Sequence, residues 1–161
     1  MANYKKNMNI GLAGEYMVAG MLSIQGWYAS LTLKNYPDID ILAHKIGAEK
    51  KPIGIQVKST LGKSSVLVGR LHRGASDKDV EETIVKGLYI FVVFDKDCEN
   101  RTSSFPTFYI VPQKDMIKLV RETNDNYFNK PREISVRDTQ PVAIKIKDLE
   151  KYKEKWEMLD K

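Results

Sequence analysis

The segment GLYIFVVF, residues 87–94, is the most continuously apolar run in the chain. An unbroken run of this length, rich in aromatic and β-branched residues, is typical of a β-strand that is covered on both faces. Covering both faces requires further layers of structure, and a chain of 161 residues that is 42% hydrophobic and 29% charged can supply them within one core. The sequence therefore predicts a central strand inside one domain that spans residues 1–161.

The first half of the chain predicts a helix followed by strands. Residues 9–25 favour a buried helix, with Asn9 as the N-cap and Gly26 just beyond its end. Further elements are expected as three consecutive antiparallel strands at 27–33, 38–43 and 53–59, a fourth strand at 64–71, and a short helix at 77–85.

The second half predicts strands and helices in alternation. Expected here are a strand at 107–112, a helix from Pro112 through Arg121, a loop or weak strand at 122–141, and a closing amphipathic helix at 147–159. The predicted fold class is α/β (α+β), with a central mixed β-sheet flanked by helices.

The apolar run from Ile10 to Gly26 contains one charged residue, Glu15, which lies on an apolar face of the predicted helix. The run is glycine-rich and short for a membrane span, so we expect no membrane association. Gly11, Gly14 and Gly20 are expected to allow close helix packing. The single cysteine, Cys98, cannot form an internal disulfide, which favours a reducing, cytoplasmic location.

Polar side chains that suit a hard cation recur at spacings of two residues in the predicted strands. Strand alternation places Asp38 and Asp40 on one face of DIDILA, and Gln56 and Lys58 on one face of IQVK. If these strands pair, their oxygen atoms converge with Glu15 from the helix. Such a set favours Mg²⁺ or Mn²⁺, completed by water and phosphate oxygens.

These residues carry a family resemblance. A helix with Glu15, then Asp40 opening an apolar triplet, then Gln56-Val57-Lys58 in an apolar strand resembles the PD-(D/E)XK nuclease superfamily. The resemblance covers about residues 9–60. In the order of its helix and strands, the chain most resembles archaeal Holliday-junction resolvases. In the Gln-x-Lys motif, it most resembles Mrr-like restriction endonucleases.

The resemblance implies a restriction-endonuclease-like fold and metal-dependent hydrolysis of nucleic acid, with DNA expected over RNA. It implies that Asp40, Gln56 and Glu15, with Asp38 as a further ligand, hold the metal, and that Lys58, Asp40, Glu15 and Gln56 form the catalytic set. Gln56 stands where the superfamily usually has an acidic residue, so the site has one formal negative charge fewer. A nuclease-like module that has lost catalysis and only binds nucleic acid or a protein partner is therefore the alternative.

The positive charge of the chain is concentrated in one stretch. Residues 45–78 contain eight Lys or Arg and two Asp or Glu, whereas the other 127 residues carry eighteen and nineteen. A local excess of this kind is typical of a surface that follows the phosphate backbone of a nucleic acid. The predicted contacts are Lys45, Lys50, Lys51, Lys63, Arg70, Arg73 and Lys78.

Two questions stay open at the level of sequence. A solvated basic face on an interaction protein unrelated to nucleic acid is a third interpretation, and it predicts no salt-dependent DNA binding. Symmetric cutting of a duplex needs two sites, so the sequence leaves a homodimer open.

Overall fold

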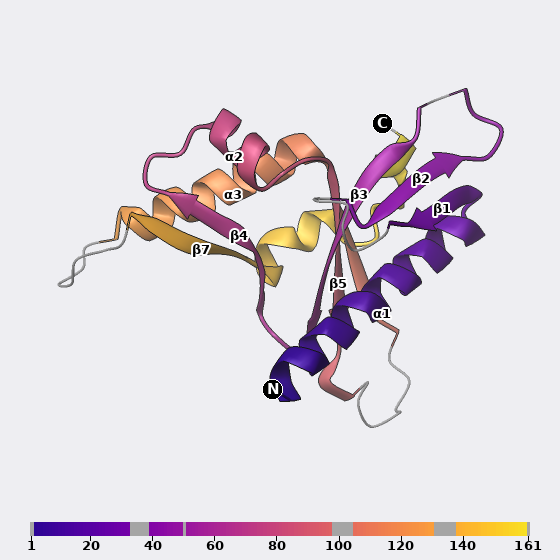
Figure 1. Cartoon of the computed structure of the whole chain (residues 1–161), viewed down its shortest axis with the longest axis horizontal. Coiled ribbons are helices and arrows are strands. Elements are labelled where there is room, and N and C mark those ends of the chain that lie inside the picture. Colours follow the sequence, from indigo (N-terminus) through magenta and orange to yellow (C-terminus); the bar gives the residue numbers. More distant parts are fainter. Residues whose placement is uncertain (1, 33–38, 50, 98–104, 131–137, 161) are drawn as a thin grey trace.

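A five-stranded mixed β-sheet forms the centre of the computed structural model, which describes residues 2–32, 39–49, 51–97, 105–130 and 138–160 (Figure 1). The strand order is β1-β2-β3-β5-β6; all neighbours are antiparallel except β3 and β5, which run parallel. Helices flank the sheet, so the predicted fold class is confirmed. The strands are β1 (Trp27–Leu31), β2 (Ile41–Lys45), β3 (Ile53–Leu61), β5 (Leu88–Phe94) and β6 (Thr107–Val111).

Strand β5 lies between β3 and β6 and is buried on both faces, as its apolar sequence predicts. Ile90 and Val92 belong to one hydrophobic cluster, which also contains residues of the N-terminal helix. Tyr89 and Phe91 point the other way, into a second cluster. The central sheet thus separates two hydrophobic cores.

Helix α1 (Ala2–Ile24) covers one face of the sheet and buries Val18 and Leu22 completely. It starts at Ala2, so the predicted N-cap at Asn9 is wrong; the polar residues before Asn9 carry no apolar periodicity from which the extension could be predicted. The helix ends before Gly26, whose φ of 82° is typical of a glycine after a helix C-terminus. In the described part of the chain, no helix has the length and apolarity needed to cross a membrane.

The other face of the sheet is covered by a second layer, which contains a separate two-stranded antiparallel sheet. The fourth strand predicted at 64–71 is present as β4, but it pairs with β7, which lies 67 to 80 positions further along the chain, and does not extend the first three strands. The loop or weak strand predicted at 122–141 is wrong in its first part, because α3 continues through Phe128. The layer consists of β4 (Ser65–His72), β7 (Thr139–Lys145), α2 (Asp77–Thr83) and α3 (Gln113–Phe128).

A buried polar residue explains the extra turns of α3. Asn124 is fully buried, donates a hydrogen bond to the His72 carbonyl oxygen (2.8 Å), and accepts one from Gln140 (3.1 Å). The amide of Asn124 can be buried here because both partners satisfy it, while its neighbours in α3 stay exposed or half-buried.

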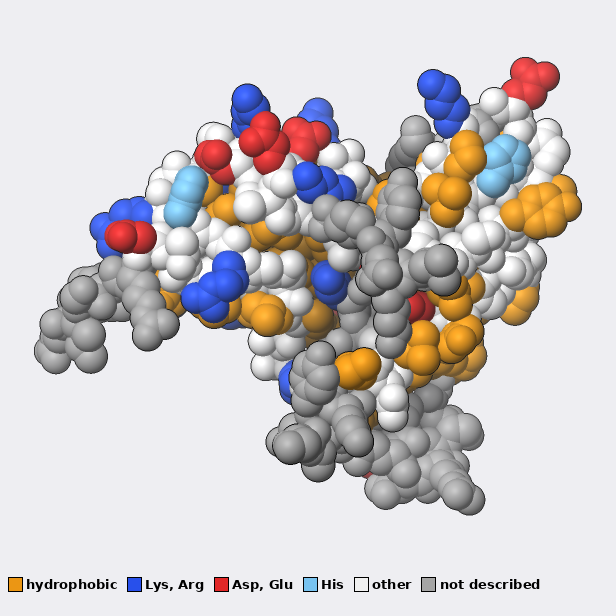
Figure 2. Space-filling view, viewed as in Figure 1, with side chains coloured by type: hydrophobic (Ala, Val, Ile, Leu, Met, Phe, Trp, Pro, Cys, Tyr) orange, Lys and Arg blue, Asp and Glu red, His pale blue; other side chains and the backbone are white. Residues whose placement is uncertain are grey.

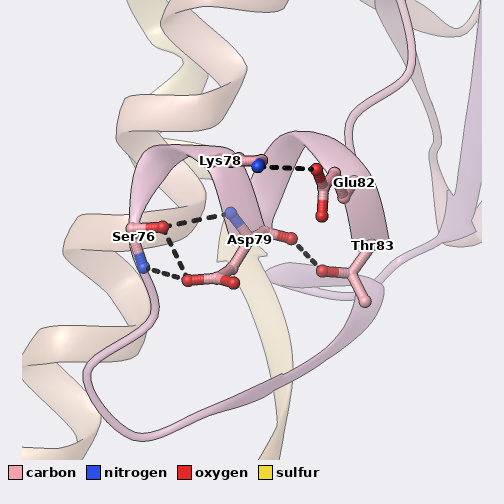
Figure 3. A network of polar contacts seen from close by, with 5 residues as sticks. All are labelled: Ser76, Lys78, Asp79, Glu82 and Thr83. Carbon is pink, nitrogen blue, oxygen red and sulfur yellow. Dashed lines mark hydrogen bonds and ion pairs between the residues drawn. The ribbon is translucent and has the colours of Figure 1, made fainter.

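Helix α2 forms where the sequence predicts a short helix, and a capping box defines its start (Figure 3). The Ser76 side chain accepts a hydrogen bond from the Asp79 N–H (3.2 Å), and Asp79 Oδ2 accepts one from the Ser76 N–H (2.8 Å). Lys78 and Glu82, one turn apart, form an exposed ion pair at 3.6 Å.

The single helix predicted at 147–159 is wrong. Two 3₁₀ helices replace it, η2 (Ile146–Tyr152) and η3 (Trp156–Asp160), with Glu154 between them at a φ of 52°. Glu154 binds β6 twice: its N–H donates to the Phe108 carbonyl oxygen and its carboxylate accepts the Phe108 N–H, both at 2.9 Å. These contacts with the sheet interrupt the helix, while Leu149, Tyr152 and Leu159 stay buried as the apolar spacing predicts.

Candidate active site

A cleft of about 880 Å³ opens between α1 and the segment that connects β3 to β4. Three of the four predicted catalytic residues line it, each from a different part of the fold: Glu15 from α1, Asp40 from the residue before β2, and Lys58 from β3. The other lining residues are Asn7, Ile10, Gly11, Val57, Ser59, Thr60, Leu61, Lys63, Ser65, Val66, Leu67 and Lys96.

Asp40 lies where β2 and β3 separate. The last paired residues of this ladder are Ile41 and Ile55, beyond which the Asp40 N–H still donates to the Ile55 carbonyl oxygen at 2.9 Å. The Asp40 carboxylate then replaces the missing strand partner, because its Oδ2 accepts the Val57 N–H at 2.7 Å. This contact fixes the carboxylate at the cleft, and Oδ1 can still accept a hydrogen bond or bind a cation.

The pleat of β3 determines where its polar side chains point. Ile55 and Val57 are buried in the core on the α1 side, so Gln56 and Lys58 project from the opposite face. Lys58 lines the cleft and is half-buried. Gln56, also half-buried, is not among the lining residues that the structure describes. The predicted shared face is therefore present, but only Lys58 of the two reaches the cleft wall.

Glu15 reaches the cleft because α1 approaches β3 closely at the preceding residue. A Cβ atom on Gly14 would lie 1.8 Å from the Ser59 Oγ and 3.0 Å from the Ser59 Cβ, so any side chain at this position would force Ser59 to move. This confirms the expected packing role for Gly14, whereas Gly11 and Gly20 have no atom within 4 Å of such a Cβ and do not serve close packing. Glu15 itself is half-buried.

The donor atoms at the cleft suit a metal that also binds substrate. Among the described residues, no three His, Cys, Asp or Glu side chains form a group able to hold a metal ion. Glu15 and Asp40 nevertheless supply two carboxylates at one cleft. Mg²⁺ in enzymes is usually held by one or two carboxylates together with waters and substrate phosphates, so the residues present fit such an ion. Asp38, the further predicted ligand, lies outside the described residues.

Two hydroxyl groups next to Lys58 are buried without a hydrogen-bond partner in the described structure, the Ser59 Oγ and the Thr60 Oγ1. Leaving a buried polar group unpaired costs about 1–3 kcal/mol. Both residues line the cleft.

Two lysines add positive charge to the cleft. Lys63 belongs to the predicted basic set, whereas Lys96 does not. The Lys96 side chain crosses the turn after β3, where a Cβ atom on Gly62 would lie 2.1 Å from its Cγ. No local sequence signal indicates this placement, because it depends on the parallel pairing of β3 with β5, which ends at Leu61 and Phe94.

The remaining predicted basic residues do not surround the cleft. Lys45 forms an ion pair with Asp160 and lies 5.5 Å from the Trp27 ring centre, and Arg73 lies 5.1 Å from the ring centre of Phe128. Figure 2 shows Lys and Arg side chains in several separate groups on the visible face. Lys78 pairs with Glu82, Arg70 and Lys51 are exposed elsewhere, and Lys50 lies outside the described residues. Of the predicted set, Lys63 is thus the member that the described structure places at the cleft.

Comparison with known proteins identifies no relative by sequence: no family model and no curated protein matches the chain. Among solved structures, the chain is similar to a bacterial homing endonuclease, I-Ssp6803I, with a TM-score of 0.49 and 14% sequence identity. The similarity extends over 94% of this chain and 91% of that one.

Proposed function

We propose that the protein is a metal-dependent nuclease of the PD-(D/E)XK type that hydrolyses DNA phosphodiester bonds. The observation that carries the proposal is that Glu15, Asp40 and Lys58 all line one open cleft. Two carboxylates and an ammonium group are the combination that phosphoryl chemistry uses: oxygen ligands for a divalent ion and a cation for the phosphate.

Each residue has a distinct role in this proposal. Asp40 and Glu15 would hold Mg²⁺ or Mn²⁺, with Asp38 as a further oxygen donor, whereas Gln56 could take part only if its side chain turned towards the cleft. The bound ion neutralises phosphate charge and lowers the pKa of a coordinated water. Lys58 donates hydrogen bonds to a phosphate oxygen and stabilises the negative charge that grows there during attack. The Val57 N–H holds the Asp40 carboxylate in one orientation at 2.7 Å, which limits its movement before substrate arrives.

The second candidate is a nuclease-like module that binds nucleic acid or a protein partner without cutting. Gln56 supports it, because the amide has no formal charge and its side chain is not among the described residues that line the cleft. Such a module keeps the fold and the lysines but binds a divalent ion weakly.

Cleavage of supercoiled plasmid with Mg²⁺ or Mn²⁺ tests the proposal. Asp40→Asn keeps an acceptor for the Val57 N–H, and Lys58→Ala removes the ammonium group; each should abolish cleavage in a protein that still folds. The matched controls are Glu122→Gln and Lys118→Ala, both exposed on α3, which should cut like the wild type. Cleavage that survives Asp40→Asn and Lys58→Ala contradicts the mechanism.

Calorimetric titration with Mn²⁺ separates the two candidates. A nuclease site should show binding that Asp40→Asn removes and Glu122→Gln retains. The inactive module should show no binding that depends on Asp40.

A further inference from the structure

One surface next to the cleft has no role in the chemistry proposed above. The β4–β7 ribbon has an inner face and an outer face, which the pairing register separates. The inner face packs into the second core through Val66, Leu71, Val142 and Ile144. The outer face is formed by the alternate residues, which are Ser65, Leu67, Arg70 and His72 of β4 with Thr139, Pro141, Ala143 and Lys145 of β7.

The outer face is uncovered and positive. Leu67, Arg70 and Lys145 are exposed, and Leu67 exposes 59% of its surface. The eight outer residues include two cations and a histidine but no Asp or Glu. An uncovered strand face with this composition suits a polyanion better than an apolar protein partner, since a Lys or Arg that neutralises a phosphate gains affinity by releasing counterions.

The positive charge is stronger at one end of the ribbon. Asp79 and Glu82 of α2 share a groove with Arg70 and His72, which offsets the charge at that end. Figure 2 shows Asp and Glu side chains gathered over α2, at the top of the view. At the cleft end, Lys145 lies next to a wall that contains three lysines and two carboxylates, so this end is the more positive one.

The outer face is also continuous with the cleft. Ser65, Val66 and Leu67 belong to both β4 and the cleft wall. Lys145 pairs with Ser65 across the ribbon, which places their Cα atoms about 5 Å apart. The junction is held by the Ile146 N–H, which donates to the Ser64 carbonyl oxygen at 2.9 Å. A nucleic-acid backbone that runs along the ribbon therefore leads directly to Lys63 and Lys58.

We infer that the outer face of the β4–β7 ribbon is the docking surface for duplex DNA, with Lys145 and Arg70 contacting backbone phosphates and guiding the strand into the cleft. The inference rests on the proposed function for its ligand. Lys145 lies far along the chain from the basic stretch at 45–78, so the pairing of β7 with β4 is what brings it to the site.

The test measures how tightly the whole chain binds duplex DNA, by fluorescence anisotropy at several salt concentrations. EDTA is present, so that no metal-dependent cleavage can occur. Lys145→Ala and Arg70→Ala should weaken binding, Lys145→Ala more strongly, and the double variant by roughly tenfold. Affinity should also depend less steeply on salt: the magnitude of the slope of log affinity against log salt should decrease by about one for each phosphate that the variant no longer neutralises. The charge-matched control is Lys114→Ala/Lys118→Ala, on the exposed side of α3, which should bind like the wild type.

Four results would overturn the inference: the wild type does not bind duplex DNA, the control variant loses as much affinity as the ribbon variants, the ribbon variants keep the wild-type affinity, or the wild type binds duplex RNA of the same sequence more tightly. Failure of the proposed chemistry is separate, because it appears as absent plasmid cleavage while the ribbon variants still weaken binding. Thermal unfolding of each variant checks that exposed substitutions leave the fold intact.

Discussion

At the scale of single residues, Gly14 shows how a missing side chain positions a chemical group. The helix can approach β3 there only because no Cβ lies between them, and the next residue along, Glu15, reaches the cleft as a result. In a sequence, a glycine inside a predicted helix indicates either lower helix stability or a close contact with another element. Gly11, Gly14 and Gly20 all allow both interpretations. The sequence does not show which of them makes the contact, because the partner, Ser59, belongs to β3, and the place of β3 against the helix depends on its pairing with β2 and β5.

Gly14→Ala should lower the free energy of unfolding by roughly 1–2 kcal/mol, since overpacking outweighs the gain in helix propensity. Gly20→Ala, where nothing lies within 4 Å of the new Cβ, should instead raise it by up to about 1 kcal/mol. Denaturant titration measures both. In a Ser59→Ala background the cost of Gly14→Ala should shrink, and an unchanged cost would show that the clash is not with the Ser59 Oγ.

Tyr109 provides a prediction about pH. Burial, followed by the nearby Glu150, raises the pKa of Tyr109 to about 12, and its hydroxyl donates to Glu150 at 3.2 Å. The folded-state pKa exceeds the ordinary value of 10.0, so the neutral form stabilises the fold below pH 10 and this stabilisation is lost as the pH rises towards 12. Tyr109→Phe should make the fall in thermal stability across this window shallower, which calorimetry at a series of pH values can measure. An unchanged pH profile would assign the loss of stability to other tyrosines.

At the scale of elements, sequence patterns predict those segments whose partners are near in the chain or whose environment is uniform. The apolar run of β5 is enough to predict burial on both faces, and β1 to β3 follow one another as antiparallel strands. The end of α3 and the break after Tyr152 do not follow from local pattern. Both depend on distant partners: Asn124 requires Gln140 and His72, and Glu154 requires Phe108.

The start of α2 is a local feature that can be tested alone. Ser76→Ala removes the acceptor for the Asp79 N–H, and loss of such an N-cap costs about 1 kcal/mol. Lys78→Ala, which removes only the exposed ion pair with Glu82, should change the free energy of unfolding by less than about 0.5 kcal/mol. Chemical unfolding of both variants makes the comparison, and equal effects would contradict a role for the cap.

At the scale of the whole molecule, the two cores share the central sheet and should unfold together. Leu22 is fully buried on the α1 side, and Met116 is fully buried on the side of the second layer. Leu22→Ala and Met116→Ala should each cost about 2–5 kcal/mol and lower the same single transition. Two separate transitions in either variant, seen by calorimetry, would contradict the prediction of one domain.

The positions of Asp40 and Lys58 at the cleft follow from local pattern more directly than the charges around them do. Their spacings are local, and strand alternation with the antiparallel pairing of β2 and β3 places both side chains on one face of the sheet. The cationic surroundings depend on long-range topology: Lys96 arrives through the β3–β5 pairing and Lys145 through the β4–β7 pairing. A count of charges along the chain instead includes Lys45, which the fold pairs with Asp160.

The hydrogen bond from the Val57 N–H to the Asp40 carboxylate makes one backbone proton an indicator of the charge on that carboxylate. A cation that binds Asp40 withdraws electron density from the accepting oxygen, so the bond weakens whether or not any phosphodiester is cut. In a nitrogen–proton correlation spectrum, the Val57 resonance would then move with added Mg²⁺ and stay fixed in Asp40→Asn. The chain thus carries its own probe of ion occupancy, independent of turnover.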